Sequence, residues 1–288
     1  MHFRTSSLVP LLLLLGLGPS GACSRRSDST TSNPWTVVTI RERRSSELPL
    51  ETTTRYLREP SSANYVPGPD SLVARVGTDE KRRPHIVIDH LGTGKVDTLF
   101  AGWASQPLWS PDGRYVSCVA WTSQETPHQL AVIDVATKKV VIRPTARASG
   151  TVTKWSPDSR MISASDVIHG TRRVMLYMVS VPEGNVTVLD SVDVLEAHDF
   201  SWSPDGRWLA FSRPTELDES EEVVVAADLW IAETGTGRVW PLIESANFVE
   251  MNPLWISDRT IQLDRYPGGS EREARQTLVV ELSYRGAK

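Results

Sequence analysis

The sequence predicts an all-β fold, a β-propeller of about five four-stranded blades closed by N-terminal strands. The first observation is a recurring motif, Trp-Ser-Pro-Asp-Gly-Arg, with copies at Trp109, Trp155 and Trp202, a decayed copy at Trp255 and a looser one near Tyr65. The first aromatic residues of successive copies are 44, 46, 47 and 53 residues apart. The second observation is that each unit contains short apolar runs separated by turn residues. Repeats of this length with four short strands are typical of propeller blades.

The motif itself predicts a tight hairpin between the first two strands of each blade. Proline presets the turn, aspartate hydrogen-bonds back to the backbone, and glycine accepts a positive φ. An apolar run follows the turn, as in residues 115–121 and 208–211. We therefore interpret the repeated aspartates as turn-forming residues rather than catalytic carboxylates: Asp112, Asp158 and Asp205.

The repeated tryptophans stand at the same position of every unit. A large aromatic side chain that is needed in each blade is expected to fill the same gap between neighbouring blades. We therefore assign these side chains to the core: Trp109, Trp155, Trp202 and Trp255.

A second hairpin follows the first in four of the units. Its strands are predicted at residues 85–89 and 96–100, 130–134 and 140–142, 174–179 and 186–189, and 228–231 and 239–242. In the fourth unit, residues 216–222 carry five acidic side chains between the second and third strands. Because these carboxylates repel one another, we expect a solvated loop there.

The last unit lacks a fourth strand. Its first strand ends at Trp255, and further strands are predicted at residues 260–263 and 277–282. Residues 35–40 and 48–52, ahead of the first unit, also have strand patterns. Since a closed ring leaves no open sheet edge, we expect the N-terminal segment to complete the last blade. The strand near residues 37–40 is then left over, so a sixth, irregular blade is the alternative.

The N-terminus has the pattern of an export signal. Arg4 precedes an apolar run at residues 8–17, and small residues precede Cys23. The run has about half of the roughly twenty residues that span a membrane. Residues 24–34 lack apolar anchors that could offset the entropy of ordering. We predict a signal peptide at 1–22, a flexible tether at 23–34 and a propeller domain at 35–288. The remaining cysteine, Cys118, lies in an apolar strand pattern and is expected to be buried.

The residues before Cys23 resemble the lipobox of bacterial lipoproteins, in which the cysteine is lipidated. Gly21 and Ala22 fit that box, whereas Ser20 stands where a leucine-like residue is usual. The resemblance implies lipid attachment at Cys23 and a membrane-anchored protein, periplasmic or on the cell surface. Ordinary signal-peptidase cleavage near Ala22 is the alternative.

The three near-intact motif copies resemble those of TolB-like propellers, whose WD40-like repeats also occur in prolyl-oligopeptidase-type peptidases. The resemblance covers roughly residues 60–285 and implies the fold rather than the function. TolB proteins have an α/β domain ahead of the propeller, and the peptidases have a hydrolase domain after it. Neither domain is expected in this chain.

Composition and spacing give no sign of a known catalytic or metal centre. The net charge of −4 and the mixed charges predict no nucleic-acid partner. Histidines 85, 90, 128, 169 and 198 lack ligand spacing, and the acidic run lacks the calcium-loop pattern. Residues 268–272 approach a nucleophile elbow but lack its last glycine. We therefore predict no catalytic, cofactor-binding or metal-binding residues.

Three functional hypotheses follow from these patterns. The first is a non-enzymatic, exported binding or scaffold protein of the bacterial cell envelope, whose partner is a protein, peptide or glycan. The second is a propeller-type lyase or hydrolase with catalytic residues that line the channel. The third is an accessory module of a larger envelope machine.

Overall fold

The computed structural model describes residues 32–43, 65–121, 129–142, 152–168, 171, 173–192, 199–219, 223–268 and 275–285. All but Ser32 belong to the unit Asn33–Lys288. Twenty strands and no helix occur among these residues, so the predicted all-β class is confirmed.

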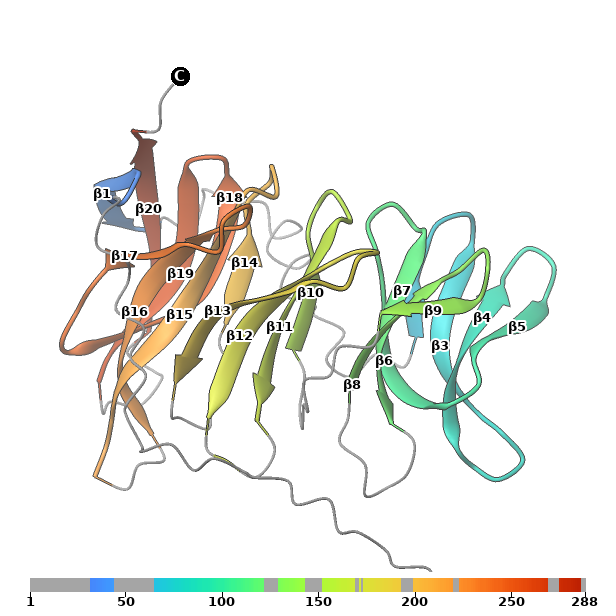
Figure 1. Ribbon diagram of the computed structural model, residues 1–288. Coiled ribbons are helices and arrows are strands. Elements are labelled where there is room, and N and C mark those ends of the chain that lie inside the picture. The colour runs from blue at the N-terminus through green and yellow to red at the C-terminus, as the bar shows by residue number, and fades with distance from the viewer. Residues whose placement is uncertain are drawn as a thin grey trace, which may run out of the picture. The chain divides into compact units, whose positions relative to one another are not determined.

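The first three blades are separate four-stranded antiparallel sheets, each built from consecutive strands (Figure 1). Short apolar runs between turn residues produce this order, because antiparallel neighbours need only tight connections. Blade 1 contains β2 (Tyr65–Pro67), β3 (Leu72–Thr78), β4 (Pro84–His90) and β5 (Lys95–Phe100); blade 2 contains β6 (Trp103–Trp109), β7 (Tyr115–Trp121), β8 (Gln129–Asp134) and β9 (Lys139–Ile142); blade 3 contains β10 (Val152–Trp155), β11 (Met161–Val167), β12 (Val174–Ser180) and β13 (Val186–Val192).

The last two blades form one eight-stranded sheet, because the parallel pair Ala227 and Val249 joins β16 to β18. Blade 4 contains β14 (Phe200–Trp202), β15 (Trp208–Leu217), β16 (Val224–Glu233) and β17 (Val239–Ile243). Blade 5 contains β18 (Phe248–Ser257), β19 (Thr260–Pro267), β20 (Gln276–Tyr284) and, from the other end of the chain, β1 (Trp35–Glu42). The prediction of five four-stranded blades is therefore confirmed.

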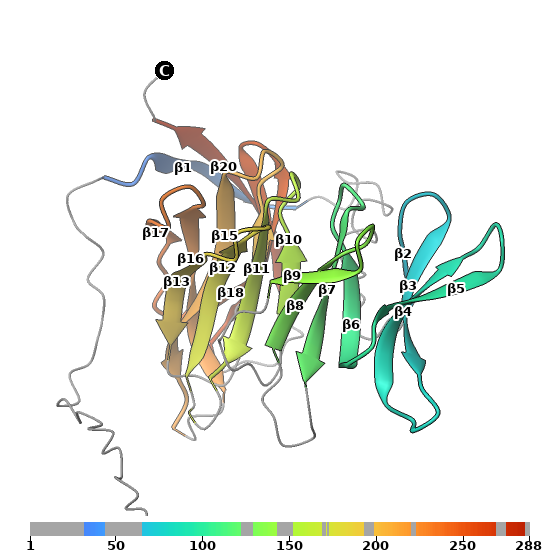
Figure 2. The same cartoon turned by 45° about the vertical axis from the view of Figure 1, so that its right-hand side comes forward.

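The strand β1 completes blade 5, as the closure hypothesis predicts. It pairs antiparallel with β20 from Trp35 opposite Tyr284 to Glu42 opposite Leu278, and Figure 2 shows the two side by side. One detail of the prediction is wrong: the strand that seemed left over near residues 37–40 is itself the closing strand. The second N-terminal strand pattern, at residues 48–52, lies outside the described residues.

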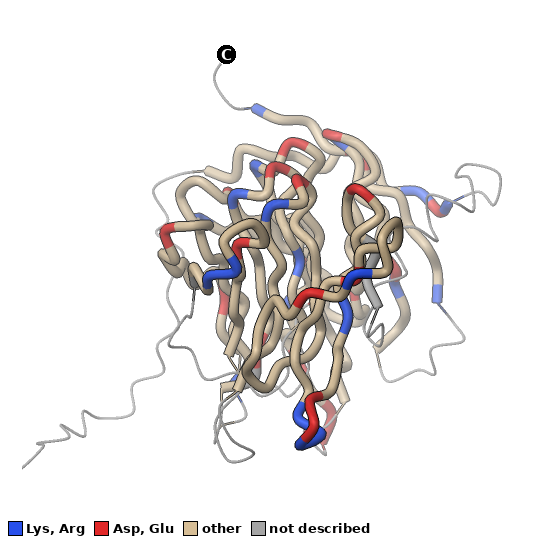
Figure 3. Tube along the Cα trace, turned by 90° about the vertical axis from the view of Figure 1, so that its right-hand side faces the viewer, with Lys and Arg blue, Asp and Glu red and all other residues tan. Residues whose placement is uncertain are grey.

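Each blade has two ends, set by the alternating direction of its strands. We call the end with the motif hairpins, at Ser110–Arg114 and its equivalents, the turn end. The opposite end is the loop end, where the first strands β6, β10, β14 and β18 begin. The hairpins between third and fourth strands also lie at the turn end, and the connections between second and third strands lie at the loop end. Charged residues of both signs gather in turns and at strand ends (Figure 3).

The core consists of apolar clusters between neighbouring blades. One cluster joins blades 1 and 2, a second joins blades 2 and 3, and two more join blade 4 to its neighbours. Cys118 lies in the first cluster with 2% of its surface exposed. Strand alternation places one face of each blade against the next, so packing between blades holds the fold together.

Candidate functional site at the loop end

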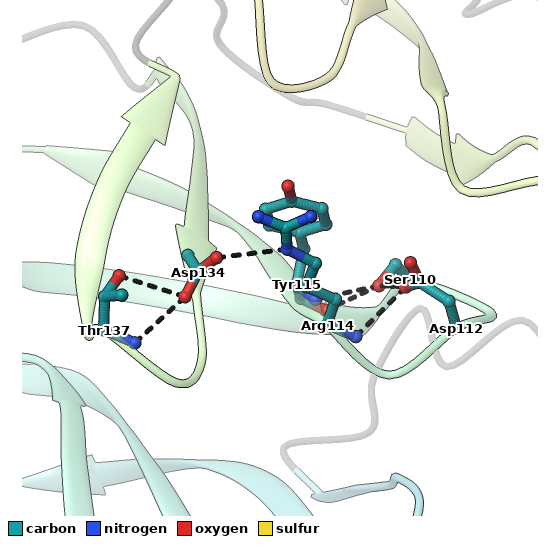
Figure 4. Close-up of polar contacts among 6 residues, drawn as sticks. All are labelled: Ser110, Asp112, Arg114, Tyr115, Asp134 and Thr137. Carbon is teal, nitrogen blue, oxygen red and sulfur yellow. Dashed lines mark hydrogen bonds and ion pairs between the residues drawn. The ribbon is translucent and has the colours of Figure 1, made fainter.

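The motif aspartates lie in hairpins whose polar atoms bond to one another. In blade 2, the Ser110 hydroxyl donates to Asp112 Oδ1 at 2.6 Å and accepts from the Tyr115 N–H at 2.9 Å. Asp112 Oδ1 also accepts from the Arg114 N–H at 3.0 Å (Figure 4). Gly113 has a φ of +72°, the left-handed conformation that glycine tolerates.

The same pattern occurs in blades 3 and 4. The Ser156 hydroxyl donates to Asp158 at 2.7 Å, and the Ser203 hydroxyl donates to Asp205 at 2.6 Å. Neighbouring hairpins also touch, because the Asp112 N–H donates to the Ser159 hydroxyl at 3.0 Å. The polar groups of the turn end therefore serve the repeat itself.

The Asp134 carboxylate closes a further turn at this end of blade 2 (Figure 4). The backbone N–H of Thr137 donates to it at 2.9 Å, and the Thr137 hydroxyl and the Arg114 guanidinium also contact it. These donors stabilise the carboxylate and hold its pKa below the ordinary value, the Thr137 N–H contributing most. The Asp134 carboxylate therefore stabilises a turn, as the motif aspartates do.

The motif tryptophans lie between blades, each buried to a similar extent. The Trp155 indole N–H donates to the Ser117 hydroxyl of blade 2 at 3.1 Å, and that of Trp202 donates to the Ser163 hydroxyl of blade 3 at 2.9 Å. In these two cases, a serine on the second strand of one blade accepts a hydrogen bond from the tryptophan of the next.

Trp255, between blades 4 and 5, breaks this pattern. Its indole N–H is buried and has no hydrogen-bond partner among the described residues. The register explains why: Ala210 pairs with Ser201, as Ser163 pairs with Lys154, so alanine stands at the serine position.

Replacing Ala210 with serine should therefore stabilise the protein. The new hydroxyl would accept from the Trp255 indole, and a satisfied buried hydrogen bond contributes about 0.5–1.5 kcal/mol. Urea unfolding of the variant measures the change. The reverse substitution at the equivalent position, Ser163→Ala, should lower the unfolding free energy, and equal losses from both variants would contradict the assignment.

Trp109 packs tightly against the turn of blade 1. A Cβ added at Gly68 would stand 2.3 Å from Trp109 Cε2, so only glycine fits. We expect Gly68→Ala to cost about 1–3 kcal/mol by displacing the indole. Gly92→Ala is the matched control, because a Cβ there meets nothing within 4 Å. Thermal unfolding of both variants tests the contact, and an unchanged Gly68→Ala protein would refute it.

The loop end differs from the turn end, because its buried polar groups are not repeated from blade to blade. The main group lies between blades 4 and 5, around Glu250 on the first strand of blade 5. The side chain of Glu250 is fully buried. Its Oε1 accepts from Arg265 Nε at 2.7 Å and from the Ser245 hydroxyl at 3.2 Å. The Ser245 N–H in turn donates to Asp228 at 3.0 Å.

This arrangement favours the neutral form of Glu250. Burial raises its pKa above the ordinary 4.5, the Asp228 carboxylate adds to the rise, and Arg265 and Ser245 offset part of it. The second oxygen, Oε2, has no partner among the described residues. A buried carboxyl group with a raised pKa, beside a second carboxylate, is a candidate for proton transfer.

Two more polar pairs lie at the loop end. Between blades 4 and 3, Arg213 Nε lies 3.2 Å from Asp190 Oδ2, and its guanidinium lies over the Trp230 ring. In blade 3, the buried Tyr177 hydroxyl donates to the buried Asp166 carboxylate. Burial and the nearby Asp166 charge raise the pKa of Tyr177. Arg213 stands at the same position of its blade as Arg265, four residues after the partner of the motif tryptophan, but the two arginines pair with carboxylates from different strands.

The acidic run has a different structure from the predicted loop. Strand β15 continues to Leu217 and pairs Glu216 with Ala226, so the start of this run belongs to a hairpin arm. The arm ends near Val223, which is 51% exposed. Strand pairing with the apolar segment 224–227 overrides the repulsion on which the loop prediction depended. Residues 220–222 lie outside the described residues.

The predicted histidines do not gather in the described part of the chain. His85 is near the Arg83 carbonyl, while His90 contacts Asp97 at 3.0 Å. His128, His169 and His198 fall outside the described residues, as does Cys23. Within the described ranges, no group of three His, Cys, Asp or Glu side chains could hold a metal ion.

Sequence reasoning missed the Glu250 group. A usable signal was present: Glu250 and Asp228 each interrupt an apolar strand pattern, in Phe248–Ser257 and Val224–Glu233. A lone acid in a buried strand needs a partner. That partner, Arg265, comes from another strand, so the sequence alone could not pair them.

The chain matches no protein-family model and no curated protein. Its fold is similar to solved β-propellers. The propeller domain of the Trilobed protease from Pyrococcus furiosus is 17% identical, with a TM-score of 0.52 over 78% of this chain and 69% of that one. An oligogalacturonate lyase in complex with manganese is 12% identical, with a TM-score of 0.50 over 76% and 64%. TolB from Acinetobacter baumannii is 18% identical, with a TM-score of 0.41 over 75% and 53%, so this chain spans about half of it.

These comparisons correct one prediction. The chain was expected not to be an enzyme, yet the fold recurs in a lyase and in a protease. The absence of sequence-adjacent catalytic motifs is therefore no ground for excluding catalysis, since a propeller can assemble a site from several blades. No described residues form a helix that is long and apolar enough to cross a membrane. The similar solved structures confirm the β-propeller fold that the repeats predict.

Proposed function

We propose that the chain is an exported β-propeller of a bacterial cell envelope that binds a protein, peptide or glycan at its loop end. The observation that supports this most is the contrast between the two ends. At the turn end, the serine and aspartate of each motif hairpin bond to each other in blades 2, 3 and 4. Among the described residues, the loop end carries buried carboxylate pairs and an exposed arm in blades 3 to 5 but not in blades 1 and 2, so the fold does not require them in each unit.

The contacts at the loop end suit a polar partner with some apolar surface. Arg265 lies over the ring of Phe248, which is 37% exposed, and Val223 marks the end of the arm. Phe248 and Arg265 lie on the paired strands β18 and β19, and the Glu250 group links both strands to Ser245 after β17. Interleaved charges of both signs argue against nucleic acid as the partner.

Affinity capture from envelope extract with the domain 24–288 tests the proposal when two variants are compared. Val223→Lys alters the loop end, and Val96→Lys alters the turn end at a residue of similar exposure, 53% against 51%. We expect the partner, identified by mass spectrometry, to be lost from the first variant and retained by the second. Equal retention by both variants would refute a loop-end site.

The anchor part of the proposal rests on the lipobox-like residues before Cys23. We expect the mature protein to begin at Cys23 and to carry acyl chains, because that thiol is the attachment point in the motif. Intact mass and N-terminal peptide mass of the protein from its envelope test this. An unmodified cysteine, or cleavage elsewhere, would show that the protein is not anchored in this way.

A second candidate is catalysis by acid–base chemistry. It is favoured by the raised pKa of Glu250 beside the Asp228 carboxylate. Screening the purified domain against polysaccharide and peptide libraries, with Glu250→Gln as the control, tests it. Turnover that Glu250→Gln abolishes would support this candidate, and turnover that survives the substitution would place the chemistry elsewhere.

A further inference from the structure

The direction of β1 determines where the N-terminal segment joins the propeller. β20 runs from the loop end to the turn end, and β1 pairs antiparallel with it. The first residue of β1, Trp35, lies opposite Tyr284, where β20 ends. The chain therefore enters the propeller at the turn end and leaves β1 at the loop end.

Contacts hold this starting point in place. The Asn33 side-chain amide donates to the Pro241 carbonyl of β17 at 2.8 Å, and the Arg285 N–H donates to the Pro34 carbonyl at 2.7 Å. Trp35 is 6% exposed, and its ring packs edge-on against Trp208 at 5.4 Å. The propeller is thus fixed to its N-terminal segment from Asn33 onward.

The distance from Cys23 to this point is short. Cys23 and Asn33 are ten positions apart in the chain, with nine residues between them. If they form the flexible tether that their composition predicts, their mean end-to-end distance is roughly 18 Å. The ten residues of β18 extend about 33 Å from one end of blade 5 to the other. A tether of that mean length does not readily reach from the turn end past the full height of a blade.

We propose that the turn end faces the lipid bilayer that holds the anchor, so that the loop end points away from the membrane. The inference rests on the proposed lipid attachment at Cys23. The loop end is then the surface that a partner can reach from the aqueous side.

Energy transfer to a membrane dye tests the orientation independently of lipidation in the cell. The domain from Cys23 onward is coupled through that thiol to a maleimide lipid in phosphatidylethanolamine–phosphatidylglycerol vesicles. A donor dye is placed on azidophenylalanine at one exposed position at a time. Gly92 and Lys81 form one pair, at the turn and loop ends of blade 1, and Gly235 and Glu219 form the second pair in blade 4.

We expect greater energy transfer from Gly92 than from Lys81, and greater transfer from Gly235 than from Glu219. Equal transfer within both pairs, or greater transfer from the loop-end positions, would overturn the orientation. The lipid is attached chemically in this experiment, so its result tests the orientation alone. Natural lipidation is tested by the mass measurement, and an unlipidated natural protein would refute the anchor.

Discussion

Replacing Trp202 with alanine is expected to lower the free energy of unfolding by about 3–5 kcal/mol. The indole fills the gap between blades 3 and 4 in a cluster with Leu176, Phe200 and Leu209, and only 8% of it is exposed. Truncation leaves a cavity and removes the hydrogen bond to Ser163. Urea unfolding of the purified domain, followed by tryptophan fluorescence and circular dichroism, measures the loss.

Trp103 provides the matched control for this substitution. It contacts Trp121 edge-on at 6.2 Å but is only partly buried, so Trp103→Ala should cost clearly less. Trp202→Phe should recover much of the stability, because the ring still fills most of the gap. A loss below about 1 kcal/mol for Trp202→Ala would mean that the indole is not core, and that its position is free for a ligand.

Replacing Arg265 with methionine is expected to cost about 3–5 kcal/mol near neutral pH, because it leaves the buried Glu250 without its counter-ion. The Arg265 Nη2 lies 2.5 Å from Glu250 Oε1, and no surface of Glu250 is exposed. Arg83→Met is the control. Its ion pair with Asp79 is exposed and screened by solvent, so Arg83→Met should cost much less than Arg265→Met.

The loss should depend on pH, with a sign that follows from the pKa of Glu250. The folded pKa is raised above 4.5, so the folded protein keeps a proton that the unfolded chain releases. The unfolding free energy therefore falls as pH rises from 4.5 through the folded pKa. Without Arg265 that pKa rises further, so the cost of Arg265→Met should be smaller at about pH 5 than at about pH 8.

A double variant separates the charge from the packing. Adding Glu250→Gln to Arg265→Met removes the buried carboxylate, so part of the lost stability at pH 8 should return and the pH dependence should flatten. A double variant as unstable and as pH-dependent as the single one would assign both effects to another group, such as Asp228.

Most of the fold could be predicted from the repeat, because the hairpins and strands of a blade are determined by short segments of sequence. Pro-Asp-Gly fixes a hairpin wherever it occurs, and alternating apolar residues on either side fix the strands. The role of β1 was harder to assign. Trp35 packs against Trp208 and Trp255, which shows that β1 belongs to the core. These contacts join segments far apart in the chain, so the sequence alone did not show them.

The candidate site was not predictable for a related reason. Glu250, Arg265 and Ser245 belong to different strands and connections, and no motif links their spacing. Only the register of β18 against β19, which places Glu250 opposite Arg265, brings two of them together. The unpaired Trp255 indole, in contrast, could be predicted from the sequence. When the repeats are aligned on the tryptophans, Ala210 stands where Ser163 stands in the preceding blade.

Photo-crosslinking in living cells tests the proposed loop-end binding most directly. Azidophenylalanine replaces Val223 at the loop end or Val96 at the turn end in the full-length chain, and both positions are exposed. The account predicts one discrete crosslinked envelope partner from Val223 and none of that species from Val96. The same crosslinked species from Val96, with none from Val223, would contradict it.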